Sequence, residues 1–175
     1  MHELVFDGDL DGNKHQRCAE VFNRLRDQYE QDGTQNKLSQ LTVSMFTHPG
    51  SFSCLSAKAA EARALLKPLL ELCKALDSGS DRDMHRVMAL EHLVQMYEIF
   101  QRADLVLTDA EADGAMAAYQ TYLVHYNELL QLSLDRKERN YNLVFKHHHM
   151  WHIVDHARFI NPRYIWCYEF EDLFD

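Results

Sequence analysis

Helix-breaking residues are scarce in this chain, and their scarcity limits the possible folds more than any other feature. Only three prolines and six glycines occur among 175 residues. Because glycine and proline mark the turns between short strands, so few of them favour long helices. Hydrophobic residues make up 46% of the chain, an ordinary share for a domain with an apolar core. We therefore expect an all-α fold.

Apolar residues recur at helical spacing along most of the sequence. In the first expected helix, the stripe consists of Cys18, Val21, Phe22, Leu25 and Tyr29. The expected helices cover residues 14–31, about 38–45 (where a strand is also possible), 57–76, 81–103, a fifth opening at residue 108, 147–159, and a short last helix at 166–174.

Several residues predict where these helices begin or break. Ser56 and Asp81 are candidate N-caps, and Thr108 with Glu111 fits a capping box. Pro68 lies inside an expected helix and should kink or divide it. Together these features predict a single helical domain over residues 1–175, with six to seven helices and a short extended N-terminal stub.

Charge and cysteine usage narrow the class of protein. The chain has 18 basic and 27 acidic residues, a net charge of −9, which argues against direct binding of nucleic acid by this segment. A supporting role inside a larger nucleic-acid enzyme stays open.

The four cysteines are scattered, which favours buried free thiols. No signal peptide and no apolar run of ~20 residues occurs, so we expect an intracellular protein that does not cross a membrane.

A histidine-rich stretch is the strongest candidate for chemistry. Five of the 11 histidines lie between positions 147 and 156. On a helix, His148, His152 and Asp155 share one face, with His149 and His156 beside them. The opposite face, expected to pack inward, consists of Met150, Ile153, Val154 and Ala157.

This polar face predicts a metal site as one of three alternatives. Two histidines at i and i+4 can bind one metal ion, and Asp155 is a third ligand or orients an imidazole. The expected metal-site residues are His148, His152, Asp155 and His156, with a further ligand from Cys167, Glu169 or Glu171 and a divalent ion, Zn or Mg. The commoner situation is a polar helix face without a ligand. General acid–base chemistry is the third alternative.

Two other motifs contain acidic residues. The stretch 161–172 interleaves aromatic and acidic side chains, which act either as core anchors or as carboxylates for a divalent-metal site. The spacing Asp7-x-Asp9-x-Asp11-Gly12 matches the first half of a calcium loop, but Cys18 stands where a glutamate is required. This segment is therefore expected to form a turn before the first helix. Phosphate-binding loops and nucleophile motifs are absent from the sequence.

The C-terminal motif resembles a segment downstream of the catalytic core in CACTA-type transposases. The resemblance covers about residues 146–172 and consists of two histidines at matching spacing (His148 and His152), a proline near the helix end (Pro162), and a closing Trp…Phe-Glu element. It implies that Glu171 is the last carboxylate of a two-metal catalytic site whose other acids lie outside this chain.

A longer resemblance is to uncharacterised, often large proteins of dinoflagellate algae, many of which look derived from mobile elements. It covers nearly the whole chain, through the matching stretches Asp7–Asn13, Gly79–Leu90, Leu123–Tyr126, Tyr141–His152 and Asn161–Leu173. The resemblance implies a helical domain that is a fragment of a larger transposon-derived protein, and nuclear residence follows from it alone.

Three functions remain in view. The leading hypothesis is a non-catalytic helical accessory or assembly domain, whose partner is the remainder of a larger polypeptide or another protein. The first alternative is the metal-binding or catalytic portion of a transposase-like or nuclease-like enzyme that uses His148, His152, Asp155 and Glu171. The second alternative is a freestanding protein-interaction module.

Overall fold

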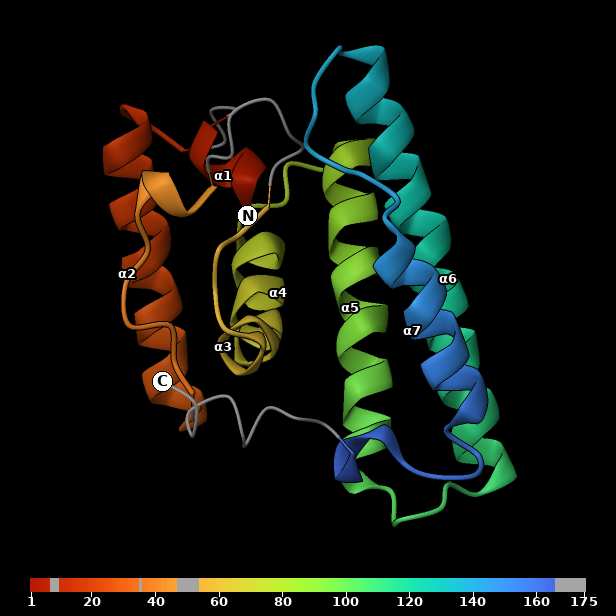
Figure 1. Cartoon of the computed structure of the whole chain (residues 1–175). Helices are drawn as coiled ribbons and strands as arrows, with labels where there is room; N and C mark the ends of the chain where they lie inside the picture. The colour runs from red at the N-terminus through yellow and green to blue at the C-terminus, as the bar shows by residue number, and fades with distance from the viewer. Residues whose placement is uncertain (7–9, 35, 47–53, 166–175) are drawn as a thin grey trace.

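The computed structural model describes residues 1–6, 10–34, 36–46 and 54–165, and these residues form helices joined by loops. No strand occurs in that part of the chain, so the predicted all-α fold is confirmed. The elements, labelled in Figure 1, are α1 (His2–Phe6), α2 (Lys14–Asp32), the 3-10 helix η1 (Val43–Phe46), α3 (Ala59–Ala64), α4 (Leu66–Ala75), α5 (Asp81–Arg102), α6 (Asp109–Asp135), α7 (Phe145–His156) and η2 (Pro162–Tyr164).

The helices form two groups that lie side by side in Figure 1. One core lies among α1, α2, η1 and α4, and its fully buried members include Leu4, Val21, Leu25 and Cys73. The other lies among α5, α6 and α7. Contacts between α4 and α5 join the two groups.

The first long helix follows the predicted pattern closely. Asn13 caps α2, and its side chain accepts hydrogen bonds from the backbone N–H groups of His15 and Gln16. Gly33 ends the helix in the left-handed region at φ 60°, which suits glycine because it has no Cβ. The predicted stripe is buried at Cys18, Val21, Leu25 and Tyr29, with Phe22 partly buried beside it.

Pro68 divides the expected helix 57–76, as predicted, into α3 and α4, which meet at Leu65. Pro68 is the third residue of α4, where a backbone N–H would have no partner within that helix, so the missing donor costs little.

Other local predictions were wrong. Lys58 rather than Ser56 is the N-cap of α3, and Ser80 rather than Asp81 is the N-cap of α5. The expected helix near 38–45 is only a 3-10 turn, η1. The stub expected to be extended contains α1, because Leu4 and Val5 become fully buried against the first core. Of the turn expected from Asp7 to Asn13, residues 7–9 lie outside the described residues, and residues 10–12 form bends before α2. The helix expected at 166–174 also lies outside the described residues.

A buried ionic network connects α1, α5 and the segment that follows α6. Arg86 lies 3.5 Å from a carboxylate oxygen of Glu3 and 2.5 Å from one of Asp83, and all three side chains are about 95% buried or more. The hydroxyl of Tyr141 donates a hydrogen bond to Glu3 at 2.7 Å. Because buried charges are costly without partners, this network ties the two helix groups together.

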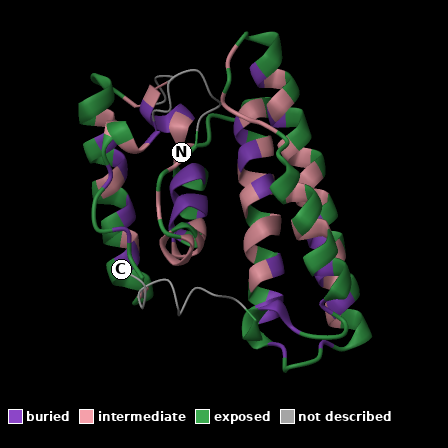
Figure 2. Ribbon diagram, viewed as in Figure 1, coloured by how far each residue is buried: buried purple, intermediate pink, exposed green. Residues whose placement is uncertain are grey.

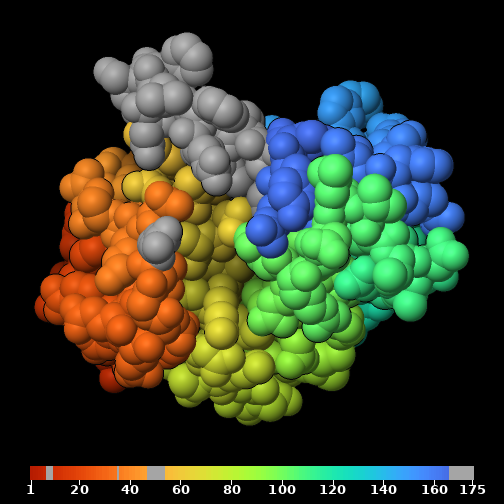
Figure 3. Space-filling view, turned by 90° about the horizontal axis from the view of Figure 1, so that it is seen from below, coloured from red at the N-terminus to blue at the C-terminus, as the bar shows by residue number. Residues whose placement is uncertain are grey.

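Asn161 anchors the end of the α7 segment to the C-terminal end of α5. It is fully buried, and its Nδ2 donates to the carbonyl oxygens of Phe100, Ala103 and Asp104 at 2.9–3.2 Å. In the view from below, the blue residues near 160 lie against the green residues that follow α5 (Figure 3). This contact closes the second group of helices into a three-helix unit.

Two thiols behave as the sequence predicted. Cys18 and Cys73 are buried free cysteines, and burial raises the pKa of each thiol. Cys54 is exposed, and Cys167 lies outside the described residues. Among the described helices, none has the length and apolar character needed to cross a membrane.

Candidate functional site

The histidine-rich stretch lies on α7, which packs against α6 along one narrow face. Val154 and Ala157 are fully buried there, and Met150 and Trp151 are partly buried beside them. Ile153 was predicted to pack inward, but it is 41% exposed. It is not among the residues that pack against the core of the second helix group. Most of α7 is exposed in Figure 2.

His147 differs from the other imidazoles because it turns toward α6. Its Nε2 lies 3.1 Å from the hydroxyl of Tyr122, and its backbone carbonyl accepts a hydrogen bond from the hydroxyl of Tyr119 at 2.6 Å. Its Nδ1 accepts from the N–H of Val144 at 3.2 Å, which caps the start of α7. Burial lowers the pKa of this imidazole, whereas the carbonyl oxygen of Val144, 3.3 Å from Nδ1, opposes that change. We therefore assign His147 a structural role.

The outer face of α7 carries a continuous row of exposed rings. The ring centroids of Phe145 and His149 are 4.4 Å apart, those of His148 and His152 are 4.5 Å apart, and Phe145 also contacts His148 at 5.6 Å. The row continues from His152 through His156 to Phe159, at 6.4 and 6.2 Å. We call these six residues the α7 ring face: Phe145, His148, His149, His152, His156 and Phe159.

This face lies opposite the side of α7 that is buried. At ~100° per residue, Phe145, His152 and His156 fall within about 40° of one another, and Val154 lies on the far side of the helix. Phe145 is 72% exposed, and Phe159, in the turn after α7, is 71% exposed. Large exposed aromatic side chains in one row are unusual for a surface that meets only water.

The structure brings together two of the predicted metal ligands. The Nε2 atoms of His148 and His152 lie 3.1 Å apart on the exposed side of α7. Asp155 does not join them: its carboxylate lies 3.9 Å from Nδ1 of His156, and both side chains are more than half exposed.

The other two predicted residues are placed differently. His156 donates from Nδ1 to the carbonyl oxygen of His152 at 2.8 Å, since a carbonyl can only accept. Glu171 lies outside the described residues, as do Cys167 and Glu169. Within the described part of the chain, no three His, Cys, Asp or Glu side chains converge to hold a metal ion. The histidine pair therefore supplies two donors from one chain.

The sequence interpretation missed the two phenylalanines of the ring face. The expected helix began at His147, so Phe145 fell outside it, and Phe159 was not assigned to either face. A signal was present, because Phe145, His152 and Phe159 are spaced by seven residues, which places them on one side of a helix.

A second histidine cluster lies between α5 and α6. Nδ1 of His85 and Nδ1 of His125 are 2.9 Å apart, and the ring of His92 stacks near His125 at 6.1 Å. Burial lowers the pKa of His125, the two neighbouring imidazoles lower it further, and the carboxylate of Glu128 opposes them. Because only one proton fits between the two Nδ1 atoms, this pair favours at least one neutral ring.

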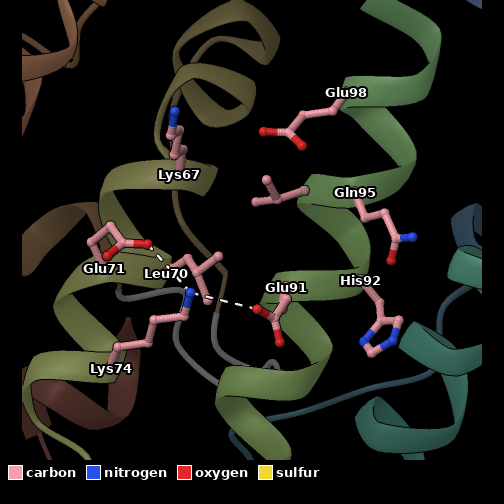
Figure 4. A pocket seen from close by; sticks show the side chains of 9 residues that line it. Lys67, Leu70, Glu71, Lys74, Glu91, His92, Gln95 and Glu98 are labelled. Carbon is pink, nitrogen blue, oxygen red and sulfur yellow. Dashed lines mark hydrogen bonds and ion pairs between the residues drawn. The ribbon is translucent and has the colours of Figure 1, made fainter.

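An open groove between α4 and α5 is lined by side chains of both charges. Lys74 lies 3.4 Å from Glu71 on its own helix and 3.5 Å from Glu91 on α5 (Figure 4). His92 also lines the groove, and its ring stacks near His125 of α6. These exposed ion pairs contribute little energy, and they fit a helix–helix contact better than a ligand site.

Comparisons with protein-family models, curated proteins and solved structures found no match to this chain. The fold and the ring face are therefore the basis for a functional assignment.

Proposed function

We propose that this chain is a non-catalytic helical assembly module of a transposon-derived protein, and that it docks onto a second polypeptide through the α7 ring face. The transposon-derived origin, and with it nuclear residence, rests on the sequence resemblances alone. The partner is either the remainder of a larger polypeptide or another protein. The observation that carries the docking role is the row of exposed rings from Phe145 to Phe159.

The energetics of exposure support this role. Phe145 and Phe159 are both more than two-thirds exposed, and burying such a side chain contributes roughly 1.5–3 kcal/mol. Contact aromatics of this kind dominate protein interfaces. Ile153 on α7 and Ile160 just after it are also about 40% exposed, which adds apolar surface near the ring face along the chain.

The charges favour a protein partner over nucleic acid. The net charge of −9 repels phosphate, and the ring face contains no arginine or lysine. Its aromatic and imidazole rings suit an apolar surface on a second protein instead. The enzymatic alternative needs Asp155 beside the histidine pair, and Asp155 contacts His156 instead.

Site-specific photo-crosslinking in cells that express the protein tests the proposal. A photoreactive phenylalanine analogue replaces Phe145 or Phe159, and a matched variant carries it at Arg26, an exposed residue of α2. We expect protein adducts at both ring-face positions that map to the same partner segment, and no such adduct at Arg26. Absence of adducts at Phe145 and Phe159, or equal adducts at all three positions, would contradict the docking role.

A further inference from the structure

The histidine pair on α7 has the geometry of half a zinc site. A tetrahedral zinc ion with Zn–N bonds of 2.0–2.1 Å holds two imidazole nitrogens ~3.3 Å apart. The Nε2 atoms of His148 and His152 lie 3.1 Å apart, and their rings are inclined at 82° with both Nε2 atoms converging. Small side-chain rotations are enough to seat the ion. Imidazole donors favour zinc over magnesium, which prefers oxygen ligands.

Among the residues that the structure describes, one chain offers only this pair. A structural zinc site needs four protein donors, and within the described residues no third His, Cys, Asp or Glu joins His148 and His152. Both imidazoles are exposed, so a second protein can approach them. A symmetric pair of chains presents the same surface twice, and two copies of α7 supply four Nε2 atoms.

We propose that His148 and His152 bind one zinc ion together with the same two residues of a second copy of this chain, so that zinc bridges a homodimer through α7. This inference rests on the proposed docking role of the ring face and names its partner. The completed set of four neutral imidazoles matches the tetrahedral preference of zinc.

The surroundings of the pair suit such an interface. Phe145 contacts the ring of His148 at 5.6 Å and would pack around the metal in the dimer. Burying it against the second copy excludes water from the ligands, and metal sites in proteins are commonly surrounded by such an apolar shell.

Zinc titration of the untagged chain tests this proposal. Binding is followed by calorimetry, and mass by sedimentation velocity, before and after addition of a chelator. We expect one zinc per two chains, conversion of monomer to dimer on addition of zinc, and reversal by the chelator. His148→Ala and His152→Ala should each weaken binding at least about tenfold and abolish the zinc-dependent dimer. His15→Ala, an exposed histidine on α2 outside the ring face, should leave both unchanged.

The outcomes separate this inference from the proposed function. One zinc per chain without a change in mass, or no binding at all, would overturn the zinc bridge. A dimer that ignores both zinc and the chelator would also overturn it, although crosslinks at Phe145 would then still support docking. Zinc-dependent dimers without any crosslink at Phe145 would sustain the bridge and contradict docking through the aromatic residues.

Discussion

Removal of the guanidinium of Arg86 should destabilise the fold severely. In Arg86→Met the aliphatic stem is retained and the positive charge is lost, which leaves the carboxylates of Glu3 and Asp83 buried without their cation. Both side chains are about 95% buried or more. Breaking a buried ion pair in this way costs about 3–5 kcal/mol. For a chain of this size, that loss lowers the Tm by roughly 6–20 °C.

The loss of stability caused by Arg86→Met should depend on pH. Burial alone would raise the pKa of Asp83, but hydrogen bonds from Ser78 and Ser80 and the charge of Arg86 outweigh it and lower the pKa. The stability that Asp83 contributes is therefore present above the ordinary carboxyl pKa near 3.8 and is lost as the pH falls through the lowered value. Wild type and Arg86→Met should thus converge in strong acid.

Urea unfolding followed by circular dichroism at pH 7 measures this difference. Arg26→Met is the matched control, because Arg26 is exposed on α2 and its replacement should change stability by less than about 0.5 kcal/mol. Adding Glu3→Gln to Arg86→Met should recover part of the loss, since a neutral amide needs no cation. A cost below about 1 kcal/mol for Arg86→Met would refute the idea that this network holds the helix groups together.

Three further substitutions probe other parts of the fold. Asn161→Ala should cost about 1–3 kcal/mol because three carbonyl oxygens, two of them in buried hydrogen bonds, lose a donor. Asn161→Asp should cost more because a carboxylate would face them, and equal thermal midpoints would contradict this. Thr108→Ala should lower the free energy of unfolding by roughly 1 kcal/mol, because α6 loses its N-cap hydrogen bond. Urea unfolding measures this loss, and an unchanged midpoint would show that the cap does not stabilise the fold. Because the pKa of His125 is lowered in the fold, this neutral ring stabilises the protein above its ordinary value of 6.5, and that stability is lost as the pH falls through the lowered value. In His125→Phe the urea midpoint should therefore fall less between pH 8 and pH 5 than in wild type. An equal fall in both proteins would contradict burial as the cause of the lowered pKa.

The local elements of the fold were predictable because their causes lie within a few residues. The stripe of α2 repeats every three to four residues, and the capping box of α6 joins Thr108 to Glu111 three residues later. The division at Pro68 follows from the missing N–H of a single residue. The apolar stripe, the capping box and the helix division each depend on residues that are close in the chain, and each lies where the sequence predicted it.

The candidate site was predictable only in part. The spacing of His148 and His152 on one helix face was sufficient to bring their Nε2 atoms within 3.1 Å. The same spacing predicted that Asp155 would share their site, but side-chain direction and the neighbouring His156 decided otherwise. Residue spacing on a helix predicts which face a side chain lies on, but it does not predict which neighbour that side chain contacts.

The amino-acid sequence by itself determined that the chain is helical, where most helices begin and end, and that α7 carries a histidine pair. Only the tertiary structure decided that Glu3, Arg86 and Tyr141 meet, or that Asn161 caps the end of α5. The reason is physical: helix periodicity acts over three or four residues, whereas these contacts join residues 57 to 138 positions apart. Such distant partners are selected by the packing of whole helices, which no local pattern encodes.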